Sequence, residues 1–447
     1  MTFLLSFFAL LLWSYVFFVE RRRGIGWISP TCLFSLGIGI FYIIPSIYWM
    51  FRPWSSDVPV YFEGIWIVML SAIILGLPFL FYAIQRKKGD NLLPMTDFIL
   101  RSRSFSNTLS WAFAVLSIVS IFFEVAKLLA GNQSRLGTNQ VELFGSTDLG
   151  YLIIENLLTI WPIFYIFLIF FGGKKARVLG MYLLVADGII SISTLQRTQI
   201  LNFLLYASVV MGFLGHKLSI KKSMFIVFIT IFTMTIVGNT PKFVRNYVEY
   251  YGVESINVIE VFGILNDSLV DSINRSESNL LKYSDLTFER LYEARSASAV
   301  MISVPDKINY QYGATMLHLF YALVPRFFWP EKPSLREIHL FTVDVMPNDQ
   351  GINPLGTLGE FYINFGFIFV FFGGFMSLWC CHFIENRFVK YYLSNKQKKL
   401  MALILIYPIS AIWIFGAAYN FTQRLSEGIR LAVVFFCLYL LFRVFKK

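Results

Sequence analysis

The chain has 447 residues, of which 57% are hydrophobic and 18% aromatic, and its formal net charge is +11. A soluble globular protein does not need so much apolar surface, so this composition indicates a polytopic membrane protein. In such a protein the placement of the cations along the chain is more informative than their sum.

Eleven apolar stretches are long enough to cross about 30 Å of hydrocarbon. They lie near residues 2–19, 27–51, 61–84, 109–130, 151–171, 178–194, 199–214, 223–238, 356–381, 400–418 and 428–445. The first stretch lacks a basic start and a small-residue cleavage site, so we expect a retained span and not a signal peptide. The pattern predicts an all-α protein with about 11 transmembrane helices.

The cations predict the orientation of these spans. Lys and Arg collect on one side, within 21–23, 86–103, 174–177, 217–222, 387–399 and 443–447, whereas the short loops of the other side hold the single arginines Arg52, Arg135, Arg197 and Arg424. The positive-inside rule makes the first side cytoplasmic. Eleven spans then place the N-terminus outside and the C-terminus inside.

One large hydrophilic region, residues 239–355, falls outside in this topology, before the last three spans. From Phe288 to Ile302 its apolar residues recur near helical spacing, which predicts an amphipathic helix. A loop of this length is expected to fold as a helical cap on what is otherwise a single membrane domain, residues 1–447.

The stretch from Leu317 to Gly366 differs from an ordinary span. Pro325, Pro330 and Pro333 fall within nine residues and exclude a straight transmembrane helix there. We expect a segment that dips toward the membrane and turns sharply. Irregular backbone at membrane depth persists only where protein or a watery cavity satisfies it, so this segment is a candidate cavity wall.

The cations predicted to face outward are mostly arginines. A guanidinium binds phosphate through two parallel hydrogen bonds and stays charged when partly desolvated, so these residues suggest a phosphate or pyrophosphate ligand. The alternative is that they pair with nearby carboxylates on a solvated surface. The candidates for this site are Arg197, Arg290, Arg295, Arg326, Lys332, Arg424 and Arg430.

A carboxylate lies near the outer edge of the span at 356–381. Glu360 and Asn364 are four residues apart and share a helix face. Glu360 is a candidate general base, and the alternative is a structural ion pair with Arg326 or Lys332. Tyr362 and Asn364 are candidate substrate-binding residues, for the diphosphate or the sugars, although aromatic rings at this depth also form the interfacial belt. No set of metal ligands is recognisable, so neither metal nor cofactor is expected.

The segments 324–333 (VPRFFWPEKP) and 358–366 (LGEFYINFG) resemble the Wzy-type polymerases of bacterial O-antigen and oligosaccharide repeat units. The span count, the external loop and Arg197 in a tight outer turn fit the same family. The resemblance implies a GT-C-like membrane glycosyltransferase that acts at the periplasmic face of the inner membrane without a metal. Such an enzyme transfers the growing chain from undecaprenyl diphosphate to the non-reducing end of a new lipid-linked repeat.

In that reading, the catalytic residues are Glu360, Arg326 and Arg197, and the other candidates bind the diphosphate or sugars. The partners are the lipid-linked oligosaccharides, the bilayer, a chain-length regulator and a flippase, with no nucleic acid. Two alternatives remain open. An O-antigen ligase has a similar layout, and a flippase or transporter of lipid-linked sugars is a different class. Transporters often show inverted repeats, and none is visible in this sequence.

Overall fold

The computed structural model describes residues 1–21, 29–51, 62–85, 111, 113–122, 164–165, 168–169, 173–193, 294–324, 329, 331, 355–393, 420–426 and 428–429. All elements within these ranges are helical, which confirms the predicted all-α class for this part of the chain. The chain forms two compact units. One comprises Met1–Met95 and Leu291–Lys447, and the other comprises Thr96–Arg290.

Among the described residues, four helical stretches are long and apolar enough to cross a membrane, at Thr2–Arg21, Pro30–Phe51, Gly64–Gln85 and Gly356–Arg387. These helices coincide with the spans predicted near 2–19, 27–51, 61–84 and 356–381. Within 109–130 the structure has a shorter apolar helix, Phe113–Phe122. The helix α8 (Lys174–Ser193) covers the stretch predicted near 178–194. The remaining predicted spans lie wholly or largely outside the described residues.

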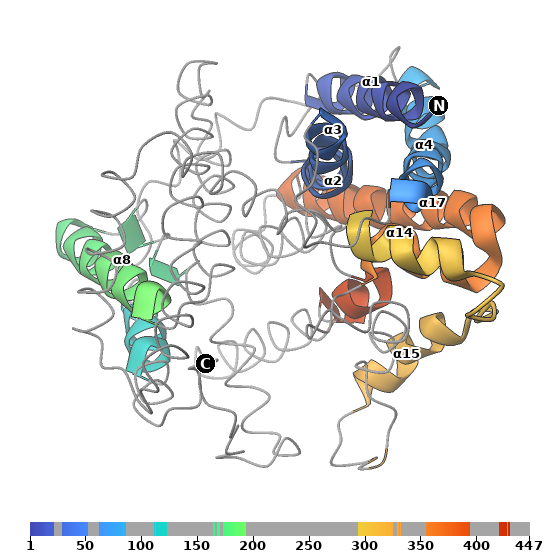
Figure 1. Ribbon diagram of the computed structural model, residues 1–447. Helices are drawn as coiled ribbons and strands as arrows, with labels where there is room; N and C mark the ends of the chain where they lie inside the picture. The colour runs from blue at the N-terminus through green and yellow to red at the C-terminus, as the bar shows by residue number, and fades with distance from the viewer. Residues whose placement is uncertain are drawn as a thin grey trace, which may run out of the picture. The chain divides into compact units, whose positions relative to one another are not determined.

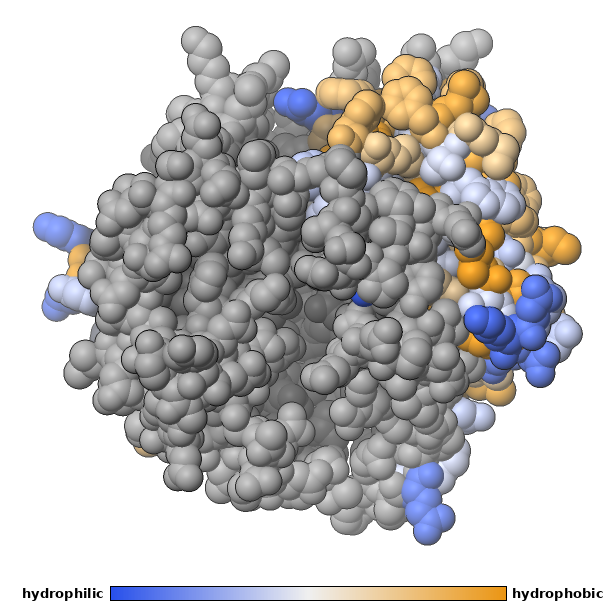
Figure 2. Space-filling model, in the orientation of Figure 1, coloured by the Kyte–Doolittle hydropathy of each residue, from blue (hydrophilic) through white to orange (hydrophobic). Residues whose placement is uncertain are grey.

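The helix α1 (Thr2–Arg21) has one face toward the protein and one face away from it. Ser6, Ala9, Trp13, Val16 and Glu20 are buried, while a stripe of large apolar side chains is exposed, at Phe3, Phe7, Leu11 and Phe18. These exposed residues recur at helical spacing. Figure 2 shows apolar side chains gathered over this part of the molecule. Such a stripe is what a helix presents to lipid.

An aromatic cluster joins α1 to the next two spans, α2 (Pro30–Ile38) and α4 (Phe62–Gln85). The indole N–H of Trp13 donates a hydrogen bond to the carbonyl of Ala72 at 3.0 Å. The rings of Phe34 and Phe79 stack 5.3 Å apart, and Trp13 contacts both. The second span continues from α2 through the π-helix η2 (Gly39–Ile43) into α3 (Ile44–Phe51).

The short helix α14 (Ala294–Ser303) lies alongside α4 and α17 (Gly356–Leu393), as Figure 1 shows. A Cβ added to Gly64 of α4 would lie 2.3 Å from the hydroxyl of Ser298, so the two backbones approach closely. Small residues permit such contact between helices in a membrane. In α14 only Arg295 and Ile302 keep partial exposure, and residues 288–293 of the predicted amphipathic helix lie outside the described residues.

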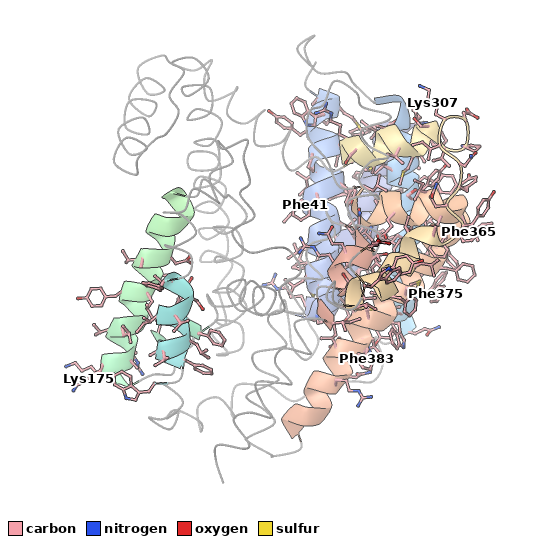
Figure 3. The ribbon with its side chains drawn as sticks, turned by 90° about the horizontal axis from the view of Figure 1, so that it is seen from below. Phe41, Lys175, Lys307, Phe365, Phe375 and Phe383 are labelled. Carbon is pink, nitrogen blue, oxygen red and sulfur yellow. The ribbon has the colours of Figure 1, made fainter. Side chains whose placement is uncertain are left out.

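The helix α17 is broken inside its apolar stretch. Phe365 and Gly366 have non-helical backbone angles, and Gly366 has φ 63° and ψ −148°. The break divides α17 into a first segment, residues 356–364, and a second segment, residues 367–393. Figure 3 shows Phe365 where the two segments meet and Phe375 and Phe383 along the second. From the break to Arg387 the second segment still rises by about 30 Å, enough to cross the hydrocarbon alone.

In the other unit, α8 contains a buried carboxylate. The hydroxyl of Tyr165 donates a hydrogen bond to Asp187 at 2.5 Å, and Asp187 is 5% exposed. The ring of Phe164, the residue before Tyr165, stacks on Phe113 with the ring centroids 5.4 Å apart. Tyr165 thus satisfies a polar group that is costly to bury in an apolar helix.

Candidate functional site

The break in α17 is satisfied by the turn that precedes α15 (Ala314–Leu323). A helix end leaves carbonyl groups without intrahelical donors. The N–H of Gln311 donates to the carbonyl of Ile363 at 2.9 Å, and the N–H of Tyr312 donates to the carbonyl of Asn364 at 3.1 Å. The end of the first segment of α17 is therefore attached to residues about 50 positions earlier in the chain.

The side chain of Asn364 makes the same connection a second time. Its Oδ1 accepts from the backbone N–H of Gly313 at 2.8 Å, and its Nδ2 donates to Oγ1 of Thr315 at 2.7 Å. Nδ2 also donates to the carbonyl of Glu360 at 2.7 Å. Asn364 is 0% exposed, so each of these bonds is shielded from water. Asn364 is predicted to bind substrate, and the contacts described here clamp it to the turn at Gly313 and to Thr315.

The carboxylate of Glu360 joins the first segment of α17 to a third part of the chain. Glu360 is 0% exposed. Its Oε2 accepts from the backbone N–H of Thr422 at 3.0 Å, and its Oε1 accepts from the Thr422 hydroxyl. The Thr422 hydroxyl also lies 3.5 Å from the sulfur of Met316 in α15. Arg326 and Lys332, the ion-pair partners considered from sequence, lie outside the described residues.

Thr422 is the second residue of a short helix that carries one of the predicted arginines. Residues 421–426 are helical, and the N–H of Arg424 donates to the carbonyl of Asn420 at 3.0 Å. Asn420 therefore holds the N-cap position, where an Asn side chain usually accepts from one of the first free N–H groups. Here the Thr422 N–H goes to Glu360 instead. Among the described residues, neither side-chain polar atom of Asn420, which is 1% exposed, has a hydrogen-bond partner.

The helix α15 ends where the proline-rich stretch begins. Its C-cap residue, Val324, is extended and directly precedes Pro325, which disfavours helical geometry in the residue before it. The rings of Tyr321 and Trp329 pack edge to face at 5.4 Å. The helix therefore ends before Pro325, and the stretch that follows lies outside the described residues except for Trp329 and Glu331.

Two segments that are distant in sequence therefore meet residues 360–364 in the first segment of α17. One is the turn 311–313 together with the start of α15, and the other is the helix 421–426. Glu360, Tyr362 and Asn364 share the first segment of α17, and Tyr362 packs edge to face on Phe367 across the break, at 5.2 Å. Arg424 follows Thr422 by two positions, and Arg295 lies on α14, which packs against α17. Arg197, Arg290, Arg326, Lys332 and Arg430 lie outside the described residues.

Gly313, Thr315 and Thr422 were not predicted as part of this site. Each is a short polar or small residue whose role depends on a partner 49 to 62 positions away. Gly366 is a signal compatible with the break, but Gly359, Gly373 and Gly374 interrupt the same run, so the sequence does not single out its position. Nothing local identifies Thr422 as the partner of a carboxylate.

The described residues form an all-helical protein with four apolar helices of membrane-spanning length and a buried polar cluster beside a helix break. No protein-family model matches the chain, and no solved structure matches it significantly.

Proposed function

We propose that this protein polymerises lipid-linked oligosaccharide repeat units, as a GT-C-like glycosyltransferase of about 11 spans whose site faces the periplasm. The observation that supports the proposal most directly is the convergence on residues 360–364. The segment LGEFYINFG, on which part of the resemblance rests, is bonded at Asn364 to the turn that leads through α15 into VPRFFWPEKP. At Glu360 it is bonded to the helix that carries Arg424.

The proposed reaction is a glycosyl transfer between two lipid-linked oligosaccharides. A hydroxyl oxygen at the non-reducing end of the acceptor forms a bond to the anomeric carbon at the reducing end of the growing chain. The bond from that carbon to the phosphate oxygen breaks, and undecaprenyl diphosphate leaves with the electron pair. The hydroxyl proton passes to a base. Negative charge develops on the diphosphate, so fixed cations in a shielded site would lower the barrier.

In this proposal, cations of the unit that contains Glu360 bind the leaving diphosphate. Arg326 is assigned the closest role, and Arg295, Arg424, Arg430 and Lys332 are assigned to the same anion-binding group. A guanidinium suits this task because it donates two parallel hydrogen bonds to a phosphate and stays charged. Tyr362 would contact sugar, since its aromatic ring offers an apolar face.

The test is a gel of surface polysaccharide from a host that lacks this gene and carries a plasmid copy. The wild-type copy should restore a ladder of chain lengths. Arg326→Ala should leave a single repeat on the acceptor lipid although the protein is present in the membrane. A matched control is Arg387→Ala, which removes an exposed arginine from the far part of α17, where it stacks on Phe383, and should keep the ladder.

The other outcomes identify the competing functions. Long polymer that still builds on the carrier lipid but never reaches its final acceptor would indicate a ligase. Single lipid-linked repeats trapped at the cytoplasmic face would indicate a flippase. A normal ladder from Arg326→Ala would remove that arginine from the site and the proposal with it.

A further inference from the structure

Glu360 is the strongest carboxylate candidate for the base, yet its surroundings suit another role. A general base must come within hydrogen-bond reach of the proton that it removes. Both carboxylate oxygens of Glu360 already accept hydrogen bonds from Thr422, and the residue is 0% exposed. A hydroxyl of the acceptor sugar would have to displace one of these bonds to reach it.

The two hydrogen bonds from Thr422 to Glu360 take the place of the usual N-terminal cap of the helix 421–426. The first N–H groups of a helix have no intrahelical acceptor and are usually satisfied by the N-cap side chain. Here the acceptor comes from α17, because Glu360 takes the N–H of Thr422 while the N-cap residue Asn420 makes no side-chain bond among the described residues. A carboxylate at a helix N-terminus is also favoured by the helix dipole.

Glu360 is itself held in place on α17. The Nδ2 of Asn364 donates to the carbonyl of Glu360, and Asn364 is fixed to Gly313 and Thr315. A chain of buried hydrogen bonds thus links the start of the helix 421–426 to the break in α17 and fixes its position. The N–H of Arg424 donates to the carbonyl of Asn420 in the first turn of that helix. The position of the helix start therefore determines the position of the Arg424 backbone.

We infer that Glu360 is a positioning residue, which caps the helix 421–426 from α17 and thereby sets the place of Arg424 against the diphosphate. This inference rests on the proposed function for the role of Arg424. The cap itself rests only on the contacts of Glu360 and Thr422. The proton of the acceptor hydroxyl then goes to another base.

Conservative and non-conservative variants separate this role from that of a base. In Glu360→Gln the amide oxygen can still accept the Thr422 N–H, and the amide nitrogen can donate to the Thr422 hydroxyl. We expect its turnover to fall by less than about tenfold, whereas Glu360→Ala should lose about 100-fold, as expected for a small misplacement of a group near the chemistry. Thr422→Ser should behave like wild type, and Thr422→Val should fall between the two Glu360 variants.

The assay uses the purified full-length protein in lipid nanodiscs with lipid-linked repeats extracted from the deletion strain. Hydrogen exchange of the peptide that covers residues 421–426 is measured on the same samples. This second readout reports the cap directly and needs no activity, because an uncapped helix end opens more often. Faster exchange is expected in Glu360→Ala and wild-type exchange in Glu360→Gln.

A double-mutant cycle tests whether Glu360 acts through Arg424. If it does, Glu360→Ala combined with Arg424→Ala should lose little more turnover than Arg424→Ala alone, because the two changes remove one interaction. Fold-losses that multiply would overturn the link between the two residues.

The remaining outcomes are distinct. If Glu360→Gln is as inactive as Glu360→Ala while exchange is unchanged, Glu360 touches the reacting atoms and the inference is wrong. If exchange in Glu360→Ala matches wild type, the cap does not exist. If wild-type protein extends no chain although exchange responds as expected, the proposed function fails and the cap stands.

Discussion

Phe361 packs directly against Gly373 across the break in α17. A Cβ added to Gly373 would lie 2.3 Å from Cδ2 and 2.5 Å from Cε2 of the Phe361 ring, far inside the contact distance of real atoms. The ring also packs on Phe369 and on Phe421 of the helix 421–426. The first segment of α17 therefore folds back onto the second, and Phe361 fills the corner that holds Glu360 and Asn364 in place.

Gly373→Ala should destabilise this corner. The new methyl group would push the Phe361 ring away, and overpacking of this kind costs about 1–3 kcal/mol. Thermal unfolding in detergent, followed with a thiol-reactive dye that detects the buried Cys32 and Cys381, measures the effect.

Gly39→Ala is the matched control, since a Cβ at Gly39 meets nothing within 4 Å. It should leave the melting temperature unchanged or raise it. The double variant Gly373→Ala with Phe361→Leu should recover part of the loss, because the smaller side chain vacates the space. An unchanged melting temperature for Gly373→Ala would mean that the segments do not pack as described.

The turn at Gly366 gives a second prediction. Its φ of 63° and ψ of −148° fall in a region that is essentially restricted to glycine. Gly366→Ala should cost about 1–3 kcal/mol from backbone strain alone, and its Cβ would also approach the Tyr310 hydroxyl at 3.3 Å. The same dye assay measures it. Gly173, which has free space around its Cβ, provides the control, and equal behaviour of the two alanine variants would argue against the sharp turn.

Local sequence patterns predicted more of the helical fold than of the site around residues 360–364. The four helices of membrane-spanning length follow from runs of apolar residues, and the end of α15 follows from Pro325. The environment of α14 does not follow from its sequence, because the polar residues Ser296 and Ser298 are both buried, and Ser298 lies against Gly64. In a membrane protein, small polar residues occur both on polar faces and in close contacts between helices.

Pairing between distant residues accounts for the rest. Glu360 and Asn364 were identified as site residues from their depth and spacing, but their partners Thr422, Gly313 and Thr315 are brought to them only by the folded chain. No local pattern distinguishes Thr422 from other threonines. The choice between base and helix cap for Glu360 therefore could not be made from the sequence.

Asn364→Ala should lower the stability of the protein more than most single substitutions near the break in α17. It would leave the N–H of Gly313 without its acceptor and the carbonyl of Glu360 and the hydroxyl of Thr315 without their donor. Each buried group that loses its partner costs about 1–3 kcal/mol, although local repacking recovers part of the sum. Detergent melting of the variant is compared with Asn309→Ala, whose side chain is exposed. Similar melting temperatures for the two variants would contradict the clamp.

Tyr165→Phe tests the buried carboxylate of the other unit. The change removes the hydroxyl that donates to Asp187, and hydrogen bonds to charged groups contribute about 1.5–3 kcal/mol. Loss of a donor to a buried acid should therefore lower the melting temperature clearly. Tyr182, also a tyrosine of this unit, is 71% exposed, so Tyr182→Phe should have little effect. If Tyr165→Phe were equally neutral, Asp187 would have to be satisfied by other groups.

Asn420→Ala provides a test of the cap from its other side. An N-cap Asn replaced by Ala normally costs about 0.5–2 kcal/mol, because the first N–H groups of the helix lose their acceptor. Here Glu360 already takes the Thr422 N–H, so we expect no loss of stability from Asn420→Ala.

Ser29→Ala is the matched comparison, since the Ser29 hydroxyl accepts from the N–H of Cys32 at the start of α2, at 3.1 Å, and its removal should cost about 1 kcal/mol. Equal losses in the two variants would show that the Asn420 amide does cap its helix. A stable Asn420→Ala protein that makes shorter chains would instead place this buried amide among the groups that bind the substrate. Burying a polar group without a partner lowers stability, and a role in substrate binding would offset this cost.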